Sequence, residues 1–390
     1  MIRNITGPPV EGKDFFGREK ELIFAWNHIQ KGNSLILSAP RRVGKSSLAK
    51  KILNKAKRKD WNVLEINLEE IKTEEGFVKI FVEKITSQSW WSKLKDDSNK
   101  KVSQILESLK PTVEFEGVKT SFEWKSNKAD VYDQLKKLLN HNKETLIMVD
   151  ELTVLLNSFI ENDTEKGRKD VEFFLNWLRS FRQTSGTKIR WIFCSSIGID
   201  NFLSQYNLSY TFNDVKPYQI DEFKNETAKN LIIELSKSDN ISLPDDTINY
   251  MLNKIGWLLP YFIQVLYSEF LQLIQVDEKP TSTKTIDEAY GKLISQRYLN
   301  TWEERLKEYN LYENYARKLL KKLSENKKGA SRKTIFSYLN TNINDTDKTE
   351  EIVSKLLYML KNDGYLIEIK SKYAFRSPLL RDFWFNRFVK

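Results

Sequence analysis

The feature that most constrains this chain is an apolar run that leads into a glycine-lysine turn. Leu35-Ile36-Leu37 is typical of a buried strand, and Leu48 and Leu53 belong to a helical pattern further on. Between them stands Gly44-Lys45-Ser46-Ser47. A strand, a turn and a helix in this order are the context that a phosphate-binding P-loop requires. Loop N–H groups and the helix dipole then attract phosphate oxygens, so the sequence predicts a nucleotide-binding core.

The residues of this loop have distinct expected roles. Lys45 is expected to reach the β- and γ-phosphates of ATP, and the Ser46 hydroxyl to ligate Mg²⁺. Ala39 stands where the motif usually has glycine, and alanine is less free at positive φ, so we expect that corner to turn differently. The expected nucleotide-binding residues of the loop are Ala39, Pro40, Arg41, Arg42, Val43, Gly44, Lys45, Ser46 and Ser47.

A second strand ends in two acids. The apolar run Leu146–Val149 is followed by Asp150 and Glu151. Ligands of open α/β sheets gather at the carboxyl ends of the strands. We therefore expect Asp150 to hold Mg²⁺ through water, and Glu151 to orient or activate a water that attacks the nucleotide.

A third apolar run, Ile189–Cys194, ends in Ser195 and Ser196. A hydroxyl at the tip of this strand would contact the γ-phosphate or hold the attacking water. The sequence does not distinguish the two serines, and simple turn serines are the alternative. A further stretch, Asn127-Lys128-Ala129-Asp130, imitates the guanine-reading motif of GTPases. It precedes the acidic strand, whereas a GTPase places it after, so we interpret it as a helix start and discount GTP.

The chain is long enough for two or three domains, since it has 390 residues. Strand patterns dominate up to Pro217 and stop beyond it. The predicted fold class is α/β, a parallel sheet with helices on both faces. The predicted boundaries are 1–215 for the P-loop core, with an elaboration and hairpin at 92–128, then 216–300 for an α-helical lid and 301–390 for a winged helix. The last assignment follows from three helical patterns before two short strands.

The net charge of +10 is concentrated near the end, where residues 301–390 carry 19 Lys/Arg against 12 Asp/Glu. Such a patch suits nucleic acid, an acidic protein or a membrane surface, and a solvated face is the alternative. If the winged helix binds DNA, its third helix would enter the major groove with Lys355 and Lys361. Winged helices also dock proteins, so DNA and protein partners both stay open.

Cysteine usage and hydropathy indicate the compartment. The chain has one cysteine, Cys194, which excludes an internal disulfide and fits a reducing cytoplasm. No apolar run approaches the roughly 18 residues that cross a bilayer. The first residues lack a signal-peptide core. We expect a soluble cytoplasmic protein without membrane insertion, and leave a homo-oligomer open.

Taken together, the motifs resemble the archaeal-type ATPases of bacteria and archaea, in the STAND branch of signal-transduction ATPases close to AAA+ proteins. The match spans nearly the whole chain. The segments that carry it are Phe16-Gly17-Arg18-Glu19, Pro40–Ser47, Val149-Asp150-Glu151, Ser195-Ser196-Ile197-Gly198, Gly256–Tyr261 and Tyr373–Asp382.

This resemblance implies further site residues. The lid proline of the family, matched by Pro260, would lie against the adenine or ribose. The segment Phe16, Gly17 and Arg18 would border the base. Arg41 and Arg42 would contact phosphate or a neighbouring domain. No sensor arginine is evident in the lid and no arginine finger is identified, so we expect weak or partner-dependent hydrolysis.

The leading hypothesis is an ATPase switch in which ATP·Mg²⁺ closes core and lid to control a partner. The rival is a winged-helix DNA-binding regulator in which nucleotide is mainly structural. A small-molecule kinase is a third possibility, but the Asp-Glu pair and the long C-terminal half disfavour it.

Overall fold

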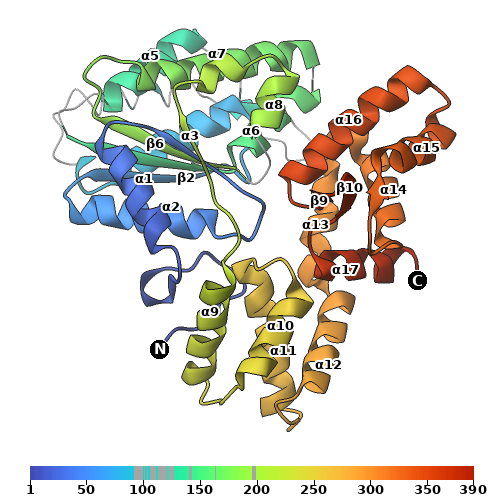
Figure 1. Cartoon of the computed structure of the whole chain (residues 1–390). Helices are drawn as coiled ribbons and strands as arrows, with labels where there is room; N and C mark the ends of the chain where they lie inside the picture. The colour runs from blue at the N-terminus through green and yellow to red at the C-terminus, as the bar shows by residue number, and fades with distance from the viewer. Residues whose placement is uncertain are drawn as a thin grey trace. The chain divides into compact units, whose positions relative to one another are not determined.

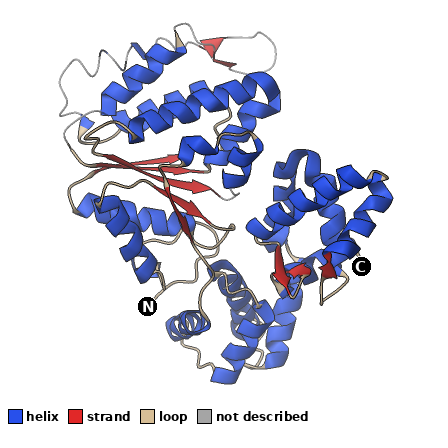
Figure 2. Ribbon diagram, turned by 45° about the horizontal axis from the view of Figure 1, so that its top comes forward, coloured by secondary structure: helices blue, strands red, loops and turns tan. Residues whose placement is uncertain are grey.

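A five-stranded parallel sheet organises the first half of the chain (Figures 1 and 2). Its strand order is β2-β5-β6-β1-β7. The strands are β1 (Leu35–Ser38), β2 (Asn62–Asn67), β5 (Thr145–Asp150), β6 (Ile189–Ser195) and β7 (Lys216–Gln219). The central strands β1, β5 and β6 are almost entirely buried, as their continuous apolar runs predict for a parallel sheet covered on both faces.

The computed structural model describes residues 1–91, 100, 102, 104–105, 111–112, 121–122, 127–139, 143–162, 164–195 and 199–390. Most of the elaboration expected at 92–128 lies outside these ranges, and so does Ser196. Within the elaboration, β3 (Pro111–Thr112) and β4 (Ser121–Phe122) pair as a short antiparallel sheet.

Helices cover both faces of the large sheet (Figure 1). On one face lie α1 (Glu19–Gln30) and α2 (Lys45–Arg58), and on the other α3 (Glu74–Thr86), α5 (Lys128–Leu139) and α7 (Thr164–Arg182). The shorter helices of this half are α6 (Leu152–Asn162), α8 (Ile199–Gln205) and the 3₁₀ turn η3 (Ser209–Phe212). The apolar faces of α3, α5 and α7 form one continuous core with β2, β5 and β6. The predicted α/β class with helices on both faces is therefore confirmed.

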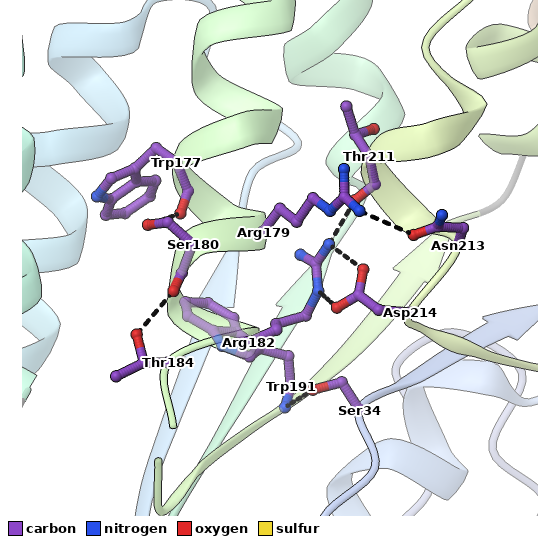
Figure 3. A network of polar contacts seen from close by, with 10 residues as sticks. All are labelled: Ser34, Trp177, Arg179, Ser180, Arg182, Thr184, Trp191, Thr211, Asn213 and Asp214. Atoms are coloured by element: carbon purple, nitrogen blue, oxygen red, sulfur yellow. Dashed lines mark hydrogen bonds and ion pairs between the residues drawn. The ribbon is translucent and has the colours of Figure 1, made fainter. Parts of the chain in front are cut away.

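A polar network near the end of α7 joins that helix to the segment before β7 (Figure 3). Arg182 donates two hydrogen bonds to the carboxylate of Asp214, at 2.8 and 3.0 Å, and a third to the Thr211 carbonyl. Next to it, Arg179 donates to the Asn213 amide oxygen. Because the Arg182 side chain is only 2% exposed, the ion pair is largely shielded from water and fixes the chain where it turns into β7.

The second half is mainly helical, as predicted. It begins with α9 (Asn225–Ser238), α10 (Asp245–Ile255), α11 (Pro260–Gln275) and α12 (Thr283–Ser295). The C-terminal region then runs through the short turns η4 (Arg297–Leu299), α13 (Asn300–Glu304) and η5 (Arg305–Tyr312). It ends with α14 (Glu313–Ser324), β8 (Ala330–Ser331), α15 (Arg332–Ile343), α16 (Thr346–Asn362), β9 (Leu366–Ile369), β10 (Lys372–Phe375) and α17 (Pro378–Phe388). Its three strands pair antiparallel in the order β8-β10-β9.

The chain divides into two compact units that do not follow its order. One contains Lys20–Ser38 and Leu48–Gln219, and so holds the large sheet. The other contains Met1–Glu19, Ala39–Ser47 and Ile220–Lys390. The P-loop segment thus belongs to the same unit as the C-terminal helices. Of the helices that the structure describes, none combines the length and the apolar character needed to cross a bilayer.

Candidate functional site

Three strands of the large sheet end in polar side chains at one edge. Because β1, β5 and β6 are parallel, their carboxyl ends lie on the same side. The register pairs Ser38, the last residue of β1, with Ser195 of β6. One strand further on, Asp150 is paired with Cys194. The structure thus brings the predicted acid and one predicted serine onto neighbouring strand ends.

Glu151 follows Asp150 in a conformation that side chains seldom adopt. Its φ is 56°, and its N–H donates to the Cys194 carbonyl at 3.0 Å and to the Asp150 carboxylate at 3.1 Å. Left-handed backbone at a residue other than glycine is costly and is concentrated at functional sites. The turn ends the strand ladder at the position where the predicted water-activating carboxylate stands.

A threonine that belongs to none of the predicted motifs lies beside the predicted serine. The hydroxyl of Thr153, in the first turn of α6, is 2.7 Å from the Ser195 hydroxyl. Both side chains are buried. A hydroxyl two positions after the acid pair was the only sequence signal for Thr153. Ser196, the other candidate, lies outside the described residues, so the choice between the serines stays open.

The P-loop folds around its lysine. The Lys45 ammonium donates to the carbonyl oxygens of Ala39 at 2.6 Å and Pro40 at 3.0 Å, and the residue is buried. The left-handed turns of the loop are at Arg42, with φ 68°, and Gly44, with φ 100°. Ala39 does not have a positive φ. Alanine therefore meets no steric penalty there, and the glycine of the usual motif is not needed at this corner.

The second of the two serines after the lysine contacts the N-terminal segment. The Ser47 hydroxyl accepts a hydrogen bond from the Val10 N–H at 3.0 Å, which ties the N-terminal segment to the start of α2. The role of metal ligand that the sequence predicts for the adjacent Ser46 stays a prediction. Hydroxyl and carboxylate oxygens, as in Ser46 and Asp150, suit the hard cation Mg²⁺. Among the described residues, no group of three or more His, Cys, Asp or Glu side chains forms a metal-binding cluster.

Arg18, in the segment expected to border the base, joins two distant parts of the chain. Its guanidinium donates to the Val43 carbonyl of the P-loop at 3.2 Å and to the Asp221 carbonyl at 2.7 Å. It also lies 4.6 Å from the ring centre of Phe223. The preceding Gly17 is so close to Thr227 of α9 that a Cβ there would lie 2.5 Å from the threonine methyl. No pattern in the sequence had pointed to Phe223 or Thr227.

Pro260, which the resemblance matched to a lid proline, occupies the first position of α11, where its fixed φ suits a helix start. The ring of the neighbouring Tyr261 forms a cation–π contact with Arg42 of the P-loop, whose guanidinium lies 4.4 Å from the ring centre. Burial raises the pKa of Tyr261, and the nearby Arg42 charge partly offsets this. Arg42 also donates to the Gly7 carbonyl at 3.2 Å. Phe16, also expected near the base, is partly buried.

A partly buried charged cluster lies near the starts of α3, α5 and α7. Glu74 forms an ion pair with Lys128 and accepts a hydrogen bond from the Tyr132 hydroxyl at 2.8 Å. Lys128 also pairs with Asp170 at 3.0 Å. Burial raises the pKa of Glu74 to about 7, although Lys128 and Tyr132 act in the opposite direction. Helices that connect parallel strands begin near the carboxyl edge of the sheet, so this cluster flanks the edge that carries Asp150.

The two lysines proposed for DNA contact are both ion-paired. Lys355 lies 2.7 Å from the Glu351 carboxylate on α16, and Lys361 lies 2.7 Å from that of Glu368 on β9. The hydrogen bond to Glu351 raises the pKa of Lys355 to about 12. The outer face of α16 is therefore close to neutral. Several other exposed lysines of this region have no carboxylate partner among the described residues, and they include Lys327, Lys328, Lys333, Lys370 and Lys372.

A parallel sheet whose first strand leads into a glycine-lysine loop and a helix is the fold of P-loop NTPases. In agreement, residues 35–205 match the family described as ATPase family associated with various cellular activities (AAA). No curated protein is significantly similar to the chain in sequence.

Solved structures share this fold over nearly the whole chain. The Walker-type ATPase PABY2304 of Pyrococcus abyssi aligns with a TM-score of 0.62 and 18% identity, over 98% of this chain and 99% of that one. The ORC2 protein of Aeropyrum pernix, solved as ADPNP–ADP complexes, aligns with a TM-score of 0.60 and 12% identity, over 99% and 97%. At these identities the likeness establishes the fold alone.

Proposed function

We propose that the chain is an ATP-binding and ATP-hydrolysing switch of the STAND and AAA+ type. The observation that carries this proposal is the order of strand ends at one edge of the sheet. The strand that leads into the P-loop ends at Ser38, which is paired with Ser195, and Asp150 and Glu151 follow on the next strand. A phosphate-binding loop after one strand, and a metal-binding acid and a water-activating acid at the end of another, are what hydrolysis of a nucleotide requires, and Ser195 ends the strand between these two.

The roles follow from the chemistry of each group. The Lys45 ammonium binds the β- and γ-phosphates, and the loop N–H groups from Gly44 onward bind phosphate oxygens. The Glu151 carboxylate orients the attacking water and takes its proton, while Ser195 or Ser196 holds the γ-phosphate or the water. The water oxygen bonds to the γ-phosphorus as the bond to the ADP oxygen breaks, which gives ADP and phosphate.

The metal and the base complete the proposed site. Mg²⁺, when bound to Ser46 and through water to Asp150, would neutralise charge on the phosphate oxygens. Phe16, Gly17, Arg18 and Pro260 would surround the base and ribose. In this proposal ATP and ADP differ in the contacts that they offer to core and lid, and the difference sets the state seen by a partner. A cytoplasmic location fits the single cysteine, which is buried.

Calorimetry on paired variants tests this function. Lys45→Ala should abolish ATP binding, whereas Lys57→Ala, an exposed residue on the same helix, should leave it unchanged. Glu151→Gln should bind ATP but slow phosphate release by roughly a hundredfold or more, because it removes the proton acceptor. ATP binding that survives in Lys45→Ala, or full turnover in Glu151→Gln, would refute these assignments. Phosphate release without an added acceptor distinguishes the ATPase from a small-molecule kinase.

A second candidate function is binding to nucleic acid through residues 301–390 as a winged helix. The observation that favours it is a set of exposed lysines that have no carboxylate partner within the described part of the chain, at Lys327, Lys328, Lys333, Lys370 and Lys372. The pairing of Lys372 with Ser331 brings the β9–β10 turn close to the start of α15, so several of these charges share one rim. Such a rim suits phosphate contacts more than base reading in the major groove.

A further inference from the structure

The P-loop contacts residues that follow it by more than two hundred positions. Gly364 stands at the end of α16 with φ 82°, the left-handed conformation that closes many helices at a glycine. A Cβ placed on it would lie 2.9 Å from Cγ of Pro40 and would collide with the indole of Trp257. Pro40, Trp257 and the Gly364 backbone therefore meet in van der Waals contact, with no room for a methyl group.

The turn that carries Gly364 is firmly anchored. On one side of it, Asp363 is buried and accepts a hydrogen bond from the Tyr309 hydroxyl at 2.6 Å. On the other side, the buried Tyr365 hydroxyl donates to the Trp302 carbonyl at 2.6 Å. Burial raises the pKa of Tyr365, and the charges of Arg305 and of Arg41 in the P-loop partly offset the effect. Because the turn is held on both sides, it acts as a rigid wall against Pro40.

A second set of contacts links the C-terminal region to the same loop through Arg376 and Arg18. Arg376, which follows β10, lies 4.9 Å from the Trp257 ring centre and bonds the Glu222 carboxylate at 2.9 Å. The carbonyl of the adjacent Asp221 accepts from Arg18, which also donates to the Val43 carbonyl of the P-loop. In a planar trans peptide the carbonyl and the following N–H point in opposite directions. Arg18 therefore holds the Val43 carbonyl on one side and turns the Gly44 N–H to the other.

We propose that Gly364 and Trp257 are positioning residues for the P-loop, so that nucleotide affinity depends on the C-terminal region. The contacts of Arg376 and Arg18 extend this support to the middle of the loop. By thermodynamic reciprocity, nucleotide binding then changes the stability of the same C-terminal contacts. The inference rests on the proposed function and names the part of the chain that regulates its binding loop.

The test is ATP and ADP affinity, measured by calorimetry on the full chain. Gly364→Ala adds one methyl group against Pro40 and Trp257, and overpacking of this kind changes an equilibrium by about tenfold to a hundredfold. We therefore expect ATP to bind at least about tenfold more weakly. Gly186→Ala is the matched control, because Gly186 has φ 70° but a Cβ on it would have no other atom within 4 Å. It introduces the same backbone strain without a collision and should bind ATP like the wild type.

Further variants separate positioning from misfolding. Pro40→Ala removes the Cγ that a Cβ on residue 364 would meet. Gly364→Ala should therefore weaken ATP binding less in the Pro40→Ala background than it does in the wild type. Arg376→Gln breaks the second set of contacts through a partly exposed side chain and should weaken ATP binding severalfold while circular dichroism stays unchanged. It decides the matter if Gly364→Ala fails to fold.

The proposed function is tested first: the wild type should bind ATP, and Lys45→Ala should abolish that binding. If Gly364→Ala and Arg376→Gln then fold and bind ATP with wild-type affinity, the inference is overturned and the proposed function stands. A loss in both variants, with Gly186→Ala unchanged, supports the inference.

Discussion

Neutralising Glu74 should change how the stability of the sheet-bearing unit depends on pH. Glu74 is 6% exposed between Lys128 and Tyr132, and burial raises its pKa from 4.5 to about 7. Between pH 4.5 and about pH 7, the Glu74 carboxyl therefore keeps its proton in the folded state but has released it in the unfolded chain. Stability falls as pH rises through this window, because deprotonation leaves a carboxylate in a poorly solvated place. A shift of this size corresponds to roughly 3 kcal/mol once pH exceeds the folded value.

The Glu74→Gln variant keeps the shape of the side chain and removes the titration. Urea unfolding of both proteins at pH 5 and pH 8 measures the effect. The free energy of unfolding of the variant should rise relative to the wild type by roughly 2 to 3 kcal/mol between these pH values. Glu83→Gln, an exposed position on the same helix, serves as the control. A difference between Glu74→Gln and the wild type that stays constant with pH, or that changes in the opposite direction, would refute the reasoning.

Two further predictions concern the strand edge and the C-terminal lysines. Thr153→Val should lower the rate of phosphate release about tenfold with little change in KM, because Ser195 loses a buried partner, whereas Thr153→Ser should restore the rate. Thr211→Val is its control, since the Thr211 hydroxyl donates to the nearby Leu208 carbonyl at 2.7 Å, and an equal loss there would rule out a specific role for Thr153. Replacing Lys328, Lys333 and Lys372 together by alanine should weaken duplex DNA binding, as fluorescence anisotropy would report. The slope of log affinity against log salt concentration should become less steep by an amount that corresponds to about three phosphate contacts. Replacing the ion-paired Lys355 and Lys361 by alanine should weaken DNA binding less. A larger loss in that second variant would show that α16 makes the DNA contact instead.

Much of the fold was predictable from local pattern. Continuous apolar runs predicted β1, β5 and β6, since a parallel strand covered on both faces has no polar side to alternate with. The glycine-lysine turn predicted the loop and the start of α2, because few other uses place that pattern between a strand and a helix. The acid pair at the end of β5 predicted which edge of the sheet would bind a nucleotide, and this stays a prediction.

The sequence alone determined which residues carry the proposed chemistry, because strand ends and a P-loop are local features of the chain. The tertiary structure decided what those residues touch. Only folding shows that Thr153 reaches Ser195, that Arg18 joins Val43 to Asp221, or that Gly364 closes against Pro40. These contacts link positions up to several hundred residues apart, and no local pattern records them, since each depends on the packing of whole elements. The ion pairs of Lys355 and Lys361 show the same limit, because a charge count cannot tell which lysines have a carboxylate beside them.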